Sequence, residues 1–87
     1  MAVTMGDGMA VVSEFEQIRT ERAQRHPTSV RCEWQVISDP RGMLLQLDTL
    51  GSSKRQIHDK VSQTIQFDRE AAIRLVAIVR EAFPDVD

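Results

Sequence analysis

Few residues in this sequence belong to types that carry out chemistry alone. Cys32 is the single cysteine, and the histidines, His26 and His58, lie far apart along the chain. Zinc sites in proteins are built from three or four clustered Cys, His or carboxylate ligands, so the sequence predicts no metal site. Residues alternate around Cys32 in a way that places its thiol on an apolar strand face, where a thiolate is disfavoured. We therefore expect Cys32 to be a small buried hydrophobic residue that reacts slowly with thiol reagents.

The remaining polar residues form no catalytic constellation. Asp48, Asp59 and Asp68 belong to different predicted elements, and their spacing does not place them together. The Gly-Ser-Ser-Lys stretch at 51–54 lacks the Gly-x-x-x-x-Gly-Lys-Ser/Thr spacing of a phosphate-binding loop and opens no predicted helix. We expect neither enzymatic activity nor a cofactor.

A basic loop is the clearest candidate for a binding site. Lys54, Arg55 and Lys60 fall close together in a polar stretch, and such side chains commonly contact phosphate oxygens. Polar side chains on the solvent-facing side of the predicted sheet, with an arginine in a turn at its far end, could extend the site. The candidate nucleic-acid-binding residues are Arg31, Arg41, Lys54, Arg55, Lys60, Thr64 and Gln66.

Three observations leave the alternative of an ordinary solvated loop open. Glu33 and Asp48 place negative charge on or near the same face. The chain has no tyrosine, and Trp34 occupies a predicted core position. Stacking of bases on aromatic side chains is a main source of single-strand affinity, so any binding is expected to depend on phosphate contacts.

Alternating polar and apolar residues predict the strands that would position these side chains. Residues 30–37 alternate cleanly, 61–67 alternate again, and 43–50 is apolar on both faces. The Ser-Asp-Pro-Arg-Gly stretch at 38–42 is typical of a turn that joins the first two strands in a hairpin. The second strand is expected to be buried on both sides, by this chain or by a partner chain.

Two helices are predicted at the ends of this sheet. Ser13 and Glu16 fit a capping box that opens a short helix over 13–25. Asp68 caps a stronger helix over 69–83, which Pro84 ends. The apolar residues of that last helix cover an arc of roughly 220°, whereas packing on one sheet needs little more than about 100°. Either the amino-terminal helix or a second copy must cover the surplus, and the candidate dimer residues are Ile73, Val76 and Ile78.

Length and composition fit one small α+β domain. The chain has 87 residues and a net charge of −2. Residues 1–12 are expected to be a disordered leader, with Met5 or Met9 as possible true starts, and 13–87 a single domain. It would hold a small antiparallel sheet of three to four strands packed against the carboxy-terminal helix. No apolar run approaches the roughly 20 residues of a membrane span and no signal peptide is evident, so a cytoplasmic location is expected.

From residue 30 to residue 83 the layout resembles the positive cofactor four family of single-stranded nucleic-acid-binding coactivators. The similarity rests on the order of a strand (31–37), a Gly-containing turn (39–42), a second strand (44–50), a basic loop (54–60), a third strand (62–67) and a Leu/Val-type helix. The resemblance implies a dimer that buries this helix and binds single strands across a curved sheet. The family has four strands and exposed sheet aromatics, whereas three strands and no such aromatics are predicted here.

Two functions therefore stand as hypotheses. The first is a small homodimeric protein that binds single-stranded DNA or RNA through a polar sheet face and a basic loop. The second is a non-enzymatic adaptor or inhibitor that binds a larger protein partner. Salt-sensitive binding to an unstructured oligonucleotide would discriminate between them, because phosphate contacts release counterions.

Overall fold

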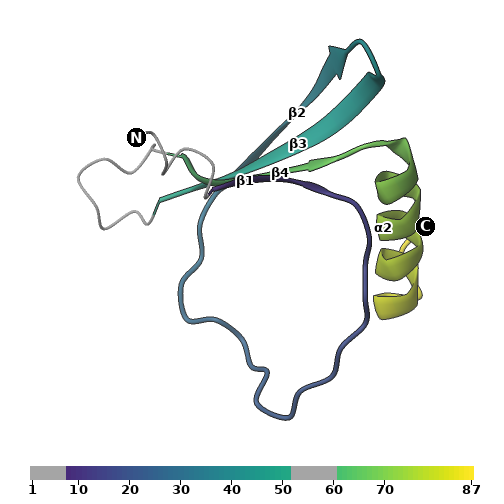
Figure 1. Ribbon diagram of the computed structural model, residues 1–87. Helices are drawn as coiled ribbons and strands as arrows, with labels where there is room; N and C mark the ends of the chain where they lie inside the picture. Colours follow the sequence, from purple (N-terminus) through teal and green to yellow (C-terminus); the bar gives the residue numbers. More distant parts are fainter. Residues whose placement is uncertain (1–7, 52–60) are drawn as a thin grey trace.

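The chain folds into a four-stranded sheet with a helix standing at one end (Figure 1). The structure is a computed structural model that describes residues 8–51 and 61–87. Its elements are β1 (Met9–Val12), β2 (Cys32–Asp39), β3 (Gly42–Leu50), β4 (Val61–Phe67) and α2 (Arg69–Ala82). The α+β class, the three predicted strands and the carboxy-terminal helix are confirmed.

The sheet is mixed and has the order β1-β4-β3-β2. β2, β3 and β4 pair antiparallel as expected, but β1 runs parallel to β4 at the sheet edge. The fourth strand comes from residues 9–12, which were expected to belong to a leader without regular structure. The Met-Ala-Val-Val sequence of β1 is too short to show an alternation, so only its pairing with β4 reveals the strand.

The hairpin turn forms as its residues predict. The Asp39 carboxylate accepts hydrogen bonds from the backbone N–H groups of Arg41 (2.9 Å) and Gly42 (3.1 Å). Gly42 has a φ of 137°, a conformation that side-chain-bearing residues rarely adopt. At the same end of the sheet, directly after β4, the Asp68 carboxylate accepts from the N–H of Ala71 (2.9 Å), so Asp68 caps α2 as predicted.

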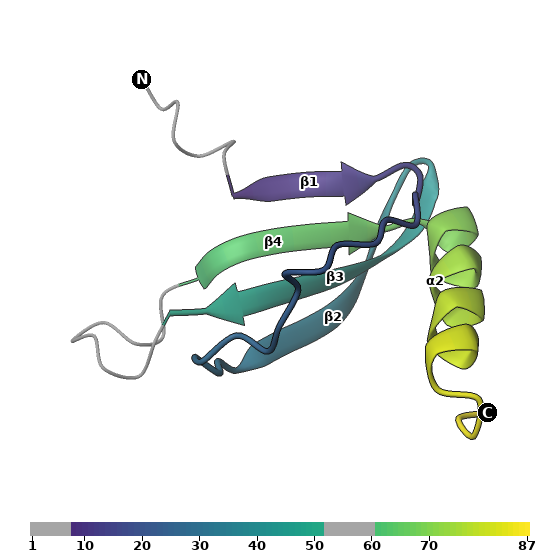
Figure 2. The ribbon, with the colours of Figure 1, turned by 90° about the horizontal axis from the view of Figure 1, so that it is seen from below.

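Strand register divides the sheet into two faces, because residues paired across strands share a side. The apolar face carries Ala10, Val12, Cys32, Trp34, Val36, Met43, Leu45, Leu47, Ile65 and Phe67. The opposite face, called the polar face, carries Glu33, Gln35, Gln46, Asp48, Thr64 and Gln66 together with the apolar Met9, Val11, Ile37 and Leu44. α2 contacts β3 and β4 and stands at the end of the sheet where β4 finishes (Figure 2).

The helix expected over residues 13–25 is not seen, and this stretch is irregular with a turn at residues 21–22. Residues 13–31, the crossover segment, lead from β1 at one sheet edge to β2 at the other and contain no helix or strand. Figure 1 shows the crossover segment arching away from the sheet. Among its described residues, Phe15 stacks on Phe67, with ring centroids 6.4 Å apart. A short helix with a narrow apolar stripe is marginal in water unless it docks, and one aromatic contact near its start gives little docking surface.

Candidate functional site

An open apolar groove lies where α2 meets the end of the sheet. The groove has a volume of about 800 Å³. Both walls are mainly apolar: Val36, Met43, Leu45 and Phe67 line the sheet side, and Ala72, Ile73 and Val76 line the helix side. The strands place the sheet residues in line because they pair across β2, β3 and β4, as Val36 with Leu45 and Leu45 with Phe67.

The groove walls remain open to solvent. Ile73 is 57% exposed and Met43 is 65% exposed, and Val36 and Val76 are also exposed. Apolar side chains gathered in a concave surface are unusual on soluble monomers and mark places where another molecule binds. The arrangement can therefore take up apolar side chains.

Charged residues stand around the apolar walls. Arg41 and Arg69 supply positive charge, and Asp68 and Glu70 supply negative charge. Asp68 is already engaged as the helix cap. A rim with both signs of charge favours a ligand whose apolar part is flanked by polar groups of either sign.

The structure separates the three predicted dimer residues. Ile73 and Val76 line the groove. Ile78 instead faces a second hollow, which it shares with Phe15, Glu16 and Gln17 of the crossover segment. The broad apolar arc of α2 is therefore divided, because part of it meets the crossover segment and the rest is left exposed.

The polar face holds a chain of hydrogen bonds. The Thr64 hydroxyl donates to the Asp48 carboxylate (2.5 Å), and the Gln46 amide donates to the same carboxylate (3.1 Å). The Gln66 amide in turn donates to the Gln46 carbonyl oxygen (2.8 Å). The bond from Thr64, and then that from Gln46, lowers the pKa of Asp48 below its ordinary value.

This network bears on two predicted nucleic-acid contacts. Thr64 is buried, and both Thr64 and Gln66 are committed to the network. Asp48, at its centre, is an ionised carboxylate that would repel phosphate. On the polar face, the side chains of Gln46, Thr64 and Gln66 are therefore already hydrogen-bonded in a network around the negative charge of Asp48.

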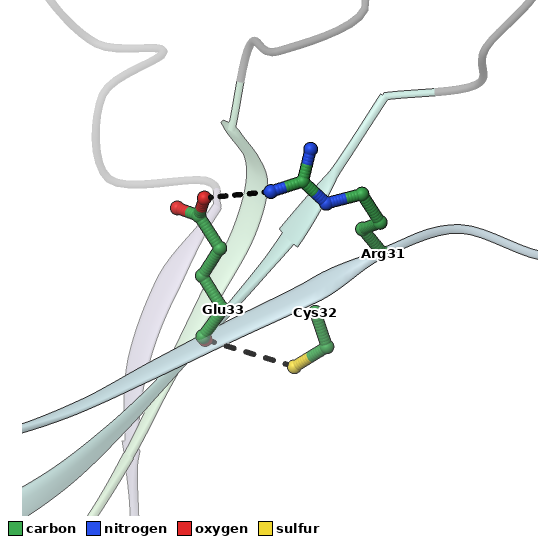
Figure 3. A network of polar contacts seen from close by, with 3 residues as sticks. All are labelled: Arg31, Cys32 and Glu33. Carbon is green, nitrogen blue, oxygen red and sulfur yellow. Dashed lines mark hydrogen bonds and ion pairs between the residues drawn. The ribbon is translucent and has the colours of Figure 1, made fainter.

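The predicted cationic residues are only partly brought together. Arg31 forms an ion pair with Glu33 at 3.3 Å on β2 (Figure 3). Arg41 lies in the turn at the opposite end of that strand, so roughly 27 Å of extended backbone separates the two arginines at about 3.3 Å per residue. Lys54, Arg55 and Lys60 lie outside the described residues.

The burial expected for Cys32 and Trp34 is wrong. Cys32 is exposed, and its thiol contacts the Glu33 carbonyl at 3.7 Å (Figure 3). Trp34 is 69% exposed on the same face of β2. The alternation correctly predicted which side chains share this face, but α2 and Phe15 cover it only near Phe67 and leave Cys32 and Trp34 exposed.

The groove itself was missed because its sheet residues were assigned to a core and Ile73 and Val76 to a dimer interface. A signal was present in the element lengths. A helix of 14 residues is about 21 Å long and about 10 Å wide, whereas four strands spaced about 4.8 Å apart make a broader surface. One such helix cannot cover the apolar face, so some of its residues had to remain exposed.

No group of three metal-ligating side chains occurs in the described ranges 8–51 and 61–87. Within the same ranges, no helix is long and apolar enough to cross a membrane.

No protein-family model matches the chain, and neither a curated protein nor a solved structure matches it. The geometry of the groove, the sheet faces and the sheet edges therefore carries the functional argument.

Proposed function

We propose that this chain is a non-enzymatic protein-binding module that receives an apolar segment of a partner protein in the groove between α2 and the sheet. The exposure of Ile73 and Val76 opposite Val36 and Met43 is the observation that carries the proposal. Burying such side chains against a partner removes apolar surface from water, which favours the complex. A groove of this kind suits a segment with apolar side chains along one face.

The rim adds selectivity to this binding. A partner segment with an acidic residue beside its apolar side chains would lie near Arg41 and Arg69, and a basic residue would lie near Glu70. Charges at an interface rim mainly steer association and select partners. The apolar walls therefore supply most of the affinity, and the rim orients the bound segment.

The test is a selection of random displayed peptides against the chain, followed by affinity measurement on two variants. Ile73→Glu places a carboxylate in the groove and should weaken the selected peptides about tenfold or more. Ala77→Glu is the matched control, because Ala77 is exposed on the same helix but does not line the groove. Equal weakening by both variants, or no enriched peptide, would contradict the proposal.

A second candidate function is supported by the exposure of Trp34. An indole that is 69% exposed offers a surface on which a base could stack. An exposed aromatic side chain was the feature that the sequence had not provided for the hypothesis of single-strand binding. The surroundings of Trp34 on the apolar face carry no ionised side chain, so phosphates would have to reach Arg31 or the basic loop. This candidate is weaker than protein binding for that reason.

A further inference from the structure

β2 is an edge strand whose outer side is unpaired by any described element. It has eight residues, and all except Ile37 are exposed. The strand contains neither proline nor lysine, and the β2–β3 pairing is regular from Cys32 to Asp39. Long, regular edge strands readily pair with another strand, and proteins usually protect them with proline, charged side chains (above all lysine) or a bulge. β2 has no proline, lysine or bulge, and its charged residues are Glu33 and Asp39.

The backbone groups that face outward can be identified. The N–H of Leu50 donates to the carbonyl of Arg31 at 3.0 Å. Because antiparallel hydrogen bonding alternates along a strand, odd-numbered residues of β2 bond to β3. The N–H and C=O groups of the even-numbered residues therefore point away from the sheet. These residues are Cys32, Trp34, Val36 and Ser38.

We propose that a second copy of this chain pairs its β2 antiparallel with this outer edge, about a two-fold axis at Gln35. This interface lies apart from the groove and does not depend on the groove binding a partner. It joins two four-stranded sheets into one continuous sheet, with both apolar faces on the same side. All four outward residues then exchange backbone hydrogen bonds, Cys32 with the partner's Ser38 and Trp34 with the partner's Val36.

Side-chain pairing selects this register. Centring on Gln35 places Trp34 beside the partner's Val36, a favourable aromatic and β-branched pair. It also places Arg31 opposite the partner's Asp39, so opposite charges meet while Arg31 keeps its contact with Glu33.

The neighbouring registers are less favourable. Centring on Val36 would place Glu33 opposite the partner's Asp39, and like charges directly opposite are destabilising. Centring on Trp34 would leave the outward groups of Ser38 unpaired and would lose the contact between Arg31 and Asp39. The edge of β2 is therefore complementary to itself in one register.

Disulfide trapping tests this register. In the Cys32→Ser, Gln35→Cys double variant the two introduced cysteines face each other at the axis. Their Cα atoms should lie about 4.5 Å apart, within the range that a disulfide bridges. Mild oxidation should therefore convert the variant to a covalent dimer. Ser38→Cys in the natural sequence should also cross-link, through Cys32 of the other copy.

Two matched controls should not cross-link. Cys32→Ser, Ile37→Cys places each cysteine about 13 Å from its equivalent, and the natural Cys32 lies about 20 Å from its own, at about 3.3 Å per residue. Sedimentation of the unmodified chain should show a dimer, and circular dichroism confirms that each variant folds. A monomer at high micromolar concentration would overturn the proposal. Equal cross-linking at positions 35 and 37, or a dimer that fails to cross-link at position 35, would overturn it as well.

Discussion

Asp48 is held in its ionised form by two neighbours on the polar face. The Thr64 hydroxyl and the Gln46 amide both donate to its carboxylate, and together they lower its pKa. The carboxylate lies on β3 and the hydroxyl on β4, so this contact connects two strands of the sheet. Its ionisation and the pairing of these strands are therefore linked.

Thr64→Val should raise the pKa of Asp48 toward the ordinary value of about 3.9. Since the native pKa lies below the unfolded one, the network stabilises the fold fully above the unfolded pKa. This contribution is lost as pH falls through the native pKa. The variant should therefore lose stability at neutral pH and show a smaller further loss on acidification.

A carboxyl titration by NMR, with urea unfolding at several pH values, measures both effects. Thr49→Val is the control, because this substitution changes the same atoms at a residue on the opposite face of the sheet. An unchanged Asp48 titration in Thr64→Val would show that the hydroxyl does not act on the carboxylate.

Cys32 should react with a water-soluble thiol reagent in the native state at nearly the rate seen in urea. The reason is that its side chain is exposed on the apolar face of β2. Pairing of β2 with a second copy leaves this face open, because the new hydrogen bonds lie in the plane of the sheet. Absorbance of the released thiolate measures the rate. Strong protection in the native state would mean that another part of the chain or a partner covers this face.

The crossover segment is the element least supported by its own contacts. Nineteen residues at 13–31 connect the two edges of the sheet without a helix or strand, a length that is uncommon for an irregular connection in a compact domain. Phe15 is half-buried against Phe67, while Ile18 is 74% exposed. The segment is therefore attached near its start and solvated over most of its length.

Phe15→Ala should lower the free energy of unfolding by about 2 kcal/mol, because it removes a stacked ring and its buried area. Ile18→Ala should change it by less than about 0.5 kcal/mol, as expected for an exposed side chain. Urea denaturation followed by Trp34 fluorescence compares the two. Similar losses in both variants would mean that Ile18 is also packed, as it would be on a docked helix.

At the scale of the whole molecule, burial is shallow. Within the described residues, the buried apolar side chains are Leu50, Phe67 and Ala71. Small domains commonly offset a small core by oligomerisation or by metal or disulfide links. A single cysteine excludes a disulfide within the chain. Pairing of β2 and occupation of the groove would each add to the buried surface of this fold.

If the chain also binds single-stranded nucleic acid, phosphate contacts should dominate the affinity. Contacts to about four phosphates would give a slope near −3 in a plot of log affinity against log salt, at about 0.7 per phosphate. The combined change of Lys54, Arg55 and Lys60 to Ala should flatten this slope. Fluorescence anisotropy with an unstructured labelled oligonucleotide measures it at several salt concentrations.

A matched variant controls for net charge in this measurement. Changing Arg19, Arg22 and Arg25 to Ala removes the same three positive charges from the exposed crossover segment. An equal effect of both triple variants would indicate bulk electrostatics and no defined site. Absence of binding to DNA and RNA at low salt would leave protein binding as the function to pursue.

The sequence by itself determined the local structure of this protein. Alternation predicted β2 and β4. The Asp-Pro-Arg-Gly turn, followed by an apolar stretch, predicted β3 and its hairpin with β2, and the Asp68 cap with its apolar repeat predicted α2. These features depend on residues close together in the chain, whose backbone preferences and hydrogen bonds are local. The same alternation also predicted which side chains of β2 and of β4 share a face.

Only the tertiary structure decided which of those faces is covered. β1 became a strand because β4 offered it an edge, and residues 13–25 remained irregular because little packs against them. Cys32, Trp34 and Val36 share an apolar face as predicted, yet they are exposed because α2 reaches only one end of the sheet. Burial depends on contacts between elements distant in sequence, and a pattern within one strand carries no information about them.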